Sequence, residues 1–281
     1  MDPFLVTPDW LESRLKSPGI VVLDCTWFVP EMKKSGHDVY LEGHIPGACF
    51  VDLNRISDQD SPYVNMMPPA DLFAREIGAL GIDNDTLVVV YNANYVSARL
   101  WWMFRHFGHD KVRVLDGGLN RWVAEGKPVE KGEPQPAAPR VFRAAAPAED
   151  IVSAEDVLAN INGGNATIVD LRPTGRFNGT ESSGYPGVPS GHMPSAINIP
   201  WTSFVTDTPD RSFLSPEQVK GVLEKAGVDL SRPIISTCGS GITAAILAMQ
   251  LERMGKHDWR IFDGSWHEWG QRADLPKEKS A

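Results

Sequence analysis

The sequence predicts an α/β protein made of two tandem domains, each with a small parallel sheet flanked by helices on both faces. Three observations support this prediction. Short apolar runs alternate with helical patterns along the chain, which is typical of parallel strands joined by crossover helices. Motifs of one half recur in the other at a nearly constant offset. The 281 residues suffice for two domains, at about 100–150 residues each.

Three pairs of motifs carry the internal repeat. They are the apolar runs that end at Asp24 and Asp170, the Gly-His-x-Pro motifs at 43–46 and 191–194, and the Asp-Gly pairs at 116–117 and 263–264, with offsets of 146, 148 and 147 residues. Because the offset hardly changes along the chain, the register of the two halves holds across most of their length. The chain therefore contains one module twice.

The elements follow in order within this frame. In the first copy, apolar runs at 21–23, 87–91 and 112–115 predict strands, and the patterns at 69–80 and 97–107 predict helices. Residues 126–150 contain five prolines and no periodicity, which indicates an extended linker. Ser153, followed by two acidic residues, predicts the start of the next helix. We expect domains over residues 1–126 and 151–281, joined by a linker over 127–150.

Composition and charge exclude several classes of function. The chain is 42% hydrophobic and 22% charged with a net charge of −9, so we expect no nucleic-acid or membrane partner. It has no long apolar run and no basic leader pattern at its start, which favours a cytoplasmic protein. Cys25, Cys49 and Cys238 lie far apart and predict neither a disulfide nor a metal site. We expect no cofactor, and a monomer or weak dimer.

The stretch from Pro233 to Leu251 predicts a strand, a tight loop and a helix, with Cys238 at the turn. Gly239 and Gly241 allow the loop to curl so that several N–H groups face one point, where the helix adds its positive end. A cysteine held there is expected to be a thiolate. The alternative is a buried, inert cysteine at the end of a core strand, which would not need a flanking Gly-Ser-Gly.

Residues 238–244, Cys-Gly-Ser-Gly-Ile-Thr-Ala, resemble the active-site loop of the rhodanese superfamily in the form typical of 3-mercaptopyruvate sulfurtransferases. Thiosulfate sulfurtransferases of that superfamily more often carry two basic residues directly after the cysteine. The resemblance extends over nearly the whole chain and implies two rhodanese-like domains. Cys238 aligns with Asn92 in the first copy, where no nucleophile is present. We therefore expect the first domain to be catalytically silent.

The resemblance implies that the protein moves a sulfane sulfur from a small anionic donor, 3-mercaptopyruvate, to a thiol, cyanide or thioredoxin-like acceptor. Cys238 would carry the sulfur as a persulfide. Arg176, expected in the loop after the first strand of the second copy, matches the arginine that holds the donor anion. The expected catalytic residues are Cys238 and Ser240, and the expected substrate-binding residues are Arg176, Tyr185, Gly239, Gly241, Ile242 and Thr243. Without the resemblance, Ser240 is a turn residue, Thr243 a residue of the first helical turn, and Arg176 a solvated charge.

The chain departs from the family pattern at three positions. Tyr185 stands where mercaptopyruvate enzymes usually have a second arginine, and a tyrosine hydroxyl cannot neutralise a carboxylate. Asn54 and Asn65 stand where some of those enzymes are proposed to use an acidic residue and a histidine beside the loop serine. Neither asparagine can act as a general base. The thiolate is therefore expected to depend mainly on loop amides and the helix dipole.

Three other functions are compatible with parts of the sequence. A thiosulfate sulfurtransferase would use the same loop with another donor. A cysteine phosphatase would need an arginine six residues after the cysteine, where this chain has Ala244. A rhodanese-like binding or regulatory module without turnover would explain Tyr185, Asn54 and Asn65, but it would not need the intact loop. Sulfur uptake by Cys238 separates the last function from the enzymes.

Overall fold

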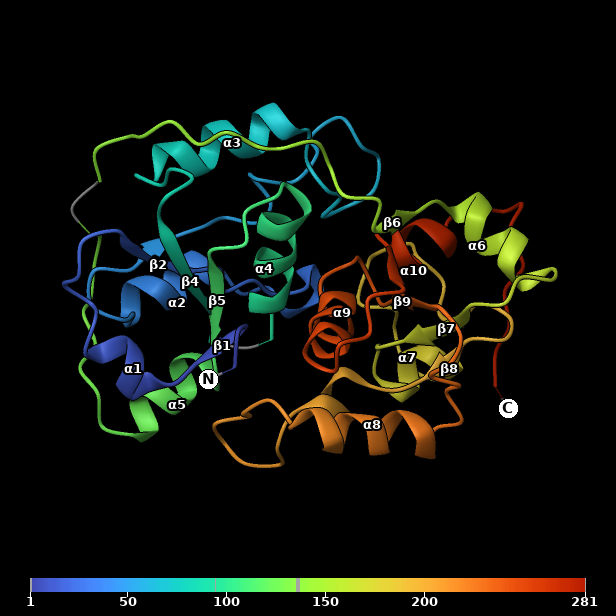
Figure 1. Ribbon diagram of the computed structural model, residues 1–281. Coiled ribbons are helices and arrows are strands. Elements are labelled where there is room, and N and C mark those ends of the chain that lie inside the picture. Colours follow the sequence, from blue (N-terminus) through green and yellow to red (C-terminus); the bar gives the residue numbers. More distant parts are fainter. Residues whose placement is uncertain (1, 94, 135–136, 281) are drawn as a thin grey trace.

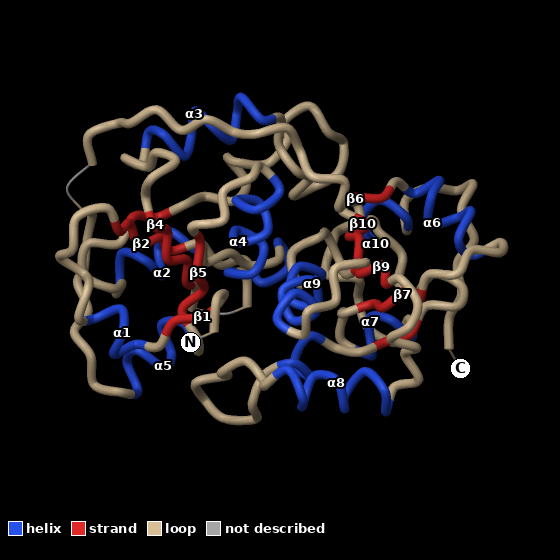
Figure 2. Tube along the Cα trace, in the orientation of Figure 1, coloured by secondary structure: helices blue, strands red, loops and turns tan. Residues whose placement is uncertain are grey.

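Each half of the chain folds around a five-stranded, fully parallel sheet in the computed structural model, which describes residues 2–93, 95–134 and 137–280 (Figure 1). The first sheet has the strand order β1 (Leu5–Val6), β5 (Val112–Leu115), β4 (Leu87–Tyr91), β2 (Ile20–Asp24), β3 (Cys49–Phe50). The second has the order β6 (Ile151–Val152), β10 (Trp259–Phe262), β9 (Ile234–Thr237), β7 (Thr167–Asp170), β8 (Ile197–Asn198). The two sheets are separate and have the same topology (Figure 2).

Helices cover both faces of each sheet, which confirms the predicted fold class. In the first half they are α1 (Pro8–Glu12), the 3-10 turn η1 (Pro30–Met32), α2 (Gly36–Glu42), α3 (Ala70–Ala79), α4 (Ser97–His106) and α5 (Gly118–Ala124). In the second half they are α6 (Ala154–Ile161), α7 (Thr174–Asn178), the 3-10 turn η2 (Trp201–Phe204), α8 (Pro216–Lys225), α9 (Ala244–Arg253) and α10 (Ser265–Trp269). None of the helices in the described ranges has the length and apolar character needed to cross a membrane.

Local sequence determines where these helices begin. The predicted start at Ser153 is confirmed, because its hydroxyl accepts the N–H of Asp156 at 3.1 Å while the Asp156 carboxylate accepts the N–H of Ser153 at 2.9 Å. This reciprocal capping satisfies N–H groups that the first turn of a helix leaves free. Ser215 and Gln218 form the same capping box at α8.

The segment 127–150 contains no helix or strand among its described residues and lies along the first domain rather than hanging free. The Arg140 N–H donates to the Gly78 carbonyl at 2.8 Å, and the Phe142 ring is buried against Phe73 and Phe104. Residues 135 and 136 of this segment lie outside the described residues. The segment is therefore a packed strap over α3 as well as a connection between the halves.

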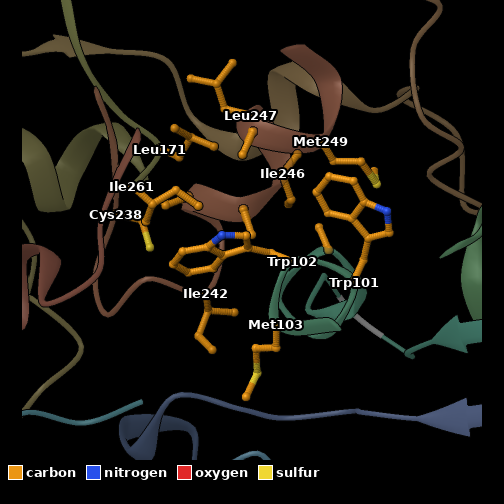
Figure 3. Packing of buried hydrophobic residues seen from close by; sticks show 14 of the residues in the cluster. Trp101, Trp102, Met103, Leu171, Cys238, Ile242, Ile246, Leu247, Met249 and Ile261 are labelled. Carbon is orange, nitrogen blue, oxygen red and sulfur yellow. The ribbon is translucent and has the colours of Figure 1, made fainter. Parts of the chain in front are cut away.

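The two domains meet through α4 and α9, which lie side by side between the sheets (Figure 1). Trp101, Trp102 and Met103 of α4 pack with Ile246 and Met249 of α9 in one buried cluster (Figure 3). Because this apolar cluster is continuous across both halves, the domains are held as a single packed unit. This packing places the loops of the first domain around the loop that carries Cys238.

Candidate functional site

Cys238 lies where β9 ends and the loop before α9 begins, as the sequence predicts. The strand–loop–helix arrangement places the thiol at the carboxyl edge of the parallel sheet and near the positive end of α9. The residue is only 2% exposed. Its backbone is fixed to α10, because the Trp266 N–H donates to the Cys238 carbonyl at 3.0 Å. The loop is thus anchored to the next crossover of the same domain.

Gly241 provides the sharp turn in this loop. Its φ is 74°, in the left-handed region that glycine adopts most readily. A Cβ at this position would lie 2.5 Å from an Asp263 carboxylate oxygen, so a larger residue has no room. The N–H groups of Cys238 and Gly241 both donate to the Ser265 hydroxyl, each at 3.1 Å. The Gly241 amide is thereby used inside the protein, which differs from the expectation that it contacts substrate.

Other loop amides are open. Within the described part of the chain, the N–H groups of Gly239, Ser240 and Ile242 have no hydrogen-bond acceptor. Buried backbone donors are rarely left without a partner, so an unpartnered set beside a thiol is a site for an anion. A persulfide or thiolate sulfur is such an anion. This arrangement matches the predicted role of the loop.

The thiol opens into a cavity of about 160 Å³ between the two domains. Seven of the eight predicted site residues line it, all except Gly241: Cys238, Gly239, Ser240, Ile242, Thr243, Arg176 and Tyr185. Sequence reasoning missed the seven other lining residues, of which four have aromatic or charged side chains: Trp27, Tyr95, Arg172 and Trp201. Their shared signal is position, because each follows a strand or precedes a helix at the carboxyl edge of a sheet.

Arg176 is placed by the short helix α7 and not by a loop, which corrects the sequence expectation. The turn between Pro173 and Asn178 is helical because Phe177 N–H donates to the Pro173 carbonyl at 3.1 Å. The guanidinium lies under Gly184, where a Cβ would come within 2.4 Å of Nη1. Its Nη2 donates to Glu31 of η1 at 3.2 Å. Arg176 is thus a partly exposed cation at the junction of the domains.

Ser240 receives two hydrogen bonds inside the protein. The Asn65 amide nitrogen donates to Ser240 Oγ at 2.9 Å, and the Tyr185 hydroxyl donates to it at 2.7 Å. Both acceptor positions of the serine oxygen are therefore filled, and its own O–H is left to donate elsewhere. The predicted position of Asn65 beside the loop serine is confirmed. Asn54 instead accepts the Trp27 indole N–H at 3.0 Å.

Tyr185 is a buried wall of the site. Its ring lies edge-on to His267 with centroids 5.0 Å apart, and a Cβ on Gly239 would meet the ring at 3.1 Å. Burial raises the pKa of Tyr185 well above its ordinary value, so its hydroxyl remains protonated. Burial also raises the pKa of Tyr95, where nearby Arg176 opposes the shift and Cys238 adds to it. The two tyrosines are hence neutral donors beside a cation and a thiol.

Thr243 occupies the N-cap position of α9, but its side chain makes no capping hydrogen bond. The purely structural alternative, in which the Thr243 hydroxyl accepts a free N–H of the first helical turn, therefore finds no support in this structure. The residue is 8% exposed and lines the cavity. Its hydroxyl remains available to a ligand.

A buried ion pair between domains holds the loop from behind. Arg99 of α4 donates to the Asp263 carboxylate and to the Asn65 carbonyl, and both charged side chains are 1% exposed. Asp263 also accepts the Met67 N–H at 2.6 Å. Arg99 therefore fixes the backbone of Asn65, whose φ is 61°, and presents that side chain to Ser240. Sequence reasoning could not see this contact, which joins residues of different domains.

Arg172 lines the cavity but its charge is already paired. Its guanidinium binds the Asp170 carboxylate through Nε and Nη2 and stacks 4.4 Å from the Trp266 ring centroid. Across the described ranges, no group of three or more histidine, cysteine, aspartate or glutamate residues is arranged to hold a metal ion. Among the described residues, the chemistry that the site can offer is therefore that of a thiol, hydroxyls, amides, the Arg176 guanidinium and the Arg172 guanidinium, whose charge Asp170 neutralises.

Comparisons with known proteins agree with this arrangement. The model of the rhodanese-like domain family matches residues 7–125 and 153–272. The chain is 40% identical to 3-mercaptopyruvate sulfurtransferase of Homo sapiens and 40% identical to thiosulfate sulfurtransferase of Bos taurus, in each case over 96% of this chain and 92% of the relative. The crystal structure of SseA from Escherichia coli, described as a 3-mercaptopyruvate sulfotransferase with the rhodanese fold, superposes with a TM-score of 0.84 at 33% identity, covering 94% of this chain and 98% of SseA.

Proposed function

The chain belongs to the rhodanese family, and from this premise we propose that it is a sulfurtransferase that takes its sulfur from 3-mercaptopyruvate through a persulfide on Cys238. One observation carries the proposal. The Cys238 thiol faces a small cavity where unpartnered loop amides and the Arg176 guanidinium converge. A nucleophile, donors for a developing anion and a cation for the other end of the donor are the three parts that sulfur transfer needs.

In the first half-reaction, the Cys238 thiolate attacks the sulfur of 3-mercaptopyruvate. The carbon–sulfur bond breaks, its electron pair goes to the methylene carbon, and the resulting enolate takes up the proton that the donor thiol releases. Pyruvate leaves and a Cys238 persulfide anion remains. The amides of Gly239 and Ile242 and the hydroxyl of Ser240 stabilise this anion.

In the second half-reaction, an acceptor removes the outer sulfur. A thiolate of a small thiol or of a thioredoxin-like protein, or cyanide, attacks that sulfur. The sulfur–sulfur bond breaks, and Cys238 leaves as a thiolate. No metal or organic cofactor takes part in either step. This ping-pong order predicts that pyruvate is released before the acceptor binds.

Arg176 holds the donor carboxylate, and Thr243 and Tyr185 contribute hydroxyls to the same cavity. The domain roles follow from this assignment. Residues 1–126 form a catalytically silent domain that walls one side of the site. Residues 127–150 connect this domain to residues 151–281, which form the domain that carries the nucleophile. Three free cysteines suit a reducing compartment, and we place the protein in the cytoplasm as a monomer or weak dimer.

Thiosulfate is the second candidate donor, because the thiosulfate sulfurtransferase of Bos taurus is as similar to this chain as the mercaptopyruvate enzyme of Homo sapiens. Steady-state kinetics with both donors decide between them. We expect a higher specificity constant for 3-mercaptopyruvate, since the loop carries Gly239 and Ser240 in place of basic residues. A higher value for thiosulfate would reverse the order of the donors and leave the Cys238 chemistry unchanged.

The experiment that tests the proposal measures the mass of the protein after it is mixed with each donor without an acceptor. Cys238 should gain one sulfur atom, and one equivalent of pyruvate should appear with 3-mercaptopyruvate. The matched control is Cys49→Ser, because burial raises the pKa of this half-buried thiol and the substitution should leave sulfur uptake unchanged. A protein that gains no sulfur from either donor is a binding module and not an enzyme of this class.

A further inference from the structure

The cation proposed to hold the donor already has a carboxylate partner. Arg176 Nη2 lies 3.2 Å from an oxygen of Glu31, and no other ion pair of Arg176 is present among the described residues. Glu31 belongs to η1 of the first domain, whose neighbours Val29 and Met32 line the cavity. A side chain of the silent domain therefore neutralises the positive charge at the cavity of the other domain.

This ion pair is weak enough to open. The Arg176 side chain is 22% exposed and that of Glu31 is 47% exposed. Pairs of such exposure contribute little to stability, because water screens both charges. The other arginine of the cavity, Arg172, binds Asp170 through Nε and Nη2, which neutralises its charge, and its buried Nη1 has no partner among the described residues. A donor anion can thus reach the cation by displacing Glu31, whose carboxylate then stays nearby.

We propose that Glu31 is a specificity-determining residue, whose carboxylate competes for Arg176 and disfavours donors with two negative charges more than donors with one. The inference rests on the proposed function, since it concerns the choice between two sulfur donors. 3-Mercaptopyruvate carries a single carboxylate charge, whereas thiosulfate carries two negative charges. Neither of the other polar walls offsets the difference: the charge of Arg172 is neutralised by Asp170, and Tyr185 is neutral with its hydroxyl bonded to Ser240.

The two effects of Glu31 scale differently with the charge of the donor. Opening the ion pair costs the same for every anion that takes Arg176. Repulsion by the displaced carboxylate is proportional to the charge of the donor, so it is about twice as large for thiosulfate. Removing the Glu31 charge should then improve both donors and improve thiosulfate more.

The test compares Glu31→Gln with the unmodified protein in steady-state kinetics at low salt. We expect the KM for 3-mercaptopyruvate to fall by about two- to fivefold, the range for an exposed ion pair. The ratio of the thiosulfate to the 3-mercaptopyruvate specificity constant should rise by about two- to fivefold more, because the repulsion acts on charge. Both fold-changes, in the KM and in the ratio of specificity constants, should approach one at about 1 M salt, where charges several ångströms apart are screened.

Glu133→Gln is the matched control. It removes the same charge from an exposed carboxylate of the connecting segment, which lies 3.1 Å from His37 of the first domain, and Glu133 does not line the cavity. It should leave both specificity constants unchanged. The inference is overturned if Glu31→Gln keeps the donor ratio of the unmodified protein, or if Glu133→Gln changes the ratio equally.

A second measurement separates this inference from the proposed function. Calorimetry on the Cys238→Ser variant, with and without Glu31→Gln, measures binding of pyruvate with one charge and of sulfate with two. A larger gain for sulfate supports the role of Glu31 even if no donor turns over. Equal gains or no gain overturn it even if the unmodified protein is an active sulfurtransferase.

Discussion

The loop at Asn92 and the loop at Cys238 share a backbone hydrogen bond, but they differ in whether their other N–H groups have acceptors. In both, the residue after the strand uses its carbonyl to accept an N–H from the next crossover, Leu119 in the first domain and Trp266 in the second, at 3.0 Å in each case. In the first domain, Asn92 Oδ1 turns back and accepts the N–H of Ser97, and Thr26 Oγ1 accepts that of Ala93. In the second domain, the corresponding N–H groups of Gly239 and Thr243 have no acceptor among the residues that the structure describes.

The two loops thus differ in how many of their backbone donors are occupied and in the volume of the cavity beside them. The cavity over the Asn92 loop measures about 30 Å³, against about 160 Å³ at Cys238. Asn92 and Thr26 accept hydrogen bonds from N–H groups of the first loop, and the corresponding N–H groups of the second loop have no such acceptors among the described residues. The exchange of cysteine for asparagine is therefore not the only difference between the two loops that the structure describes.

The largest expected effect is that of Cys238→Ser, which should lower sulfur transfer by about a thousandfold or more, because a hydroxyl is a far weaker nucleophile and forms no persulfide. Adding Asn92→Cys to this variant should restore nothing, since Thr26 still holds the Ala93 amide and the cavity stays small. Turnover and sulfur uptake measured by mass spectrometry check both variants. Sulfur on residue 92 would show that a cysteine alone is sufficient.

The second prediction concerns the equivalent aspartates at the ends of β2 and β7. Asp170 is fully buried and paired with Arg172, so Asp170→Asn should lower the free energy of unfolding by about 3–5 kcal/mol, the scale for leaving a buried charge unpaired. Asp24 is equally buried, yet Thr26 stands where the second copy has Arg172, and one carboxylate oxygen has no partner among the described residues. Asp24→Asn should change stability by less than about 1 kcal/mol at pH 7.

The pH dependence of stability gives a second test of the comparison between Asp24 and Asp170. Burial raises the pKa of Asp24 above its ordinary value of 3.8. Between that value and the raised one, the folded protein binds more protons than the unfolded chain, so stability falls as the pH rises through this window and the loss persists at neutral pH. Asp24→Asn should remove this slope. Urea unfolding from pH 4 to pH 7 measures it, and a slope that survives the substitution would assign it to another group.

Much of this architecture could be predicted because it is local or repeated. The strand before Cys238 and the helix after it follow from short apolar patterns among residues less than 20 positions apart, and the duplication follows from motifs that recur at offsets of 146 to 148 residues. Gly241 also predicted the turn in the loop after Cys238. These features depend on local or repeated sequence patterns and not on how the domains pack.

The rest depends on contacts between domains, which no periodicity encodes. Arg99 and Asp263 are 164 positions apart, and Glu31 and Arg176 are 145 apart. Each pair joins residues of different domains, which are held together where α4 and α9 pack. Ser265 shows a subtler signal. Its φ of 49° matches the 56° of its counterpart Gly118, so a serine in a place suited to glycine indicates that its hydroxyl is needed.

The third prediction concerns Arg176, the cation at the Cys238 cavity. Arg176→Ala should lower the specificity constant for 3-mercaptopyruvate by about 1–3 kcal/mol, or roughly ten- to a hundredfold, because a charge-assisted hydrogen bond is lost. Most of the loss should appear in KM. Arg75→Ala is the control, because Arg75 is an exposed arginine of α3 that does not line the cavity, and it should leave the kinetics unchanged. An unchanged specificity constant in Arg176→Ala would mean that another residue holds the donor.

The smallest effect is expected at Tyr185, where sequence and structure suggest opposite experiments. From the sequence, restoring an arginine should help, because relatives of the mercaptopyruvate type usually have a second cation there. In the structure the side chain is 5% exposed and packs against Gly239 and His267. An arginine would have to bury its charge or push the loop away, so Tyr185→Arg should raise the donor KM and lower stability.

Tyr185→Phe isolates the hydroxyl, because it keeps the ring. Ser240 then loses one of its two donors and retains Asn65, so its O–H is directed less firmly at the sulfur. We expect the specificity constant to fall by about two- to tenfold, the value of one neutral hydrogen bond, with little change in KM. Since burial keeps the pKa of Tyr185 above its ordinary value of 10.0, the pH profiles of the two proteins should run parallel up to that pH. A profile that changes shape in Tyr185→Phe would show that the tyrosine exchanges a proton and does more than orient Ser240.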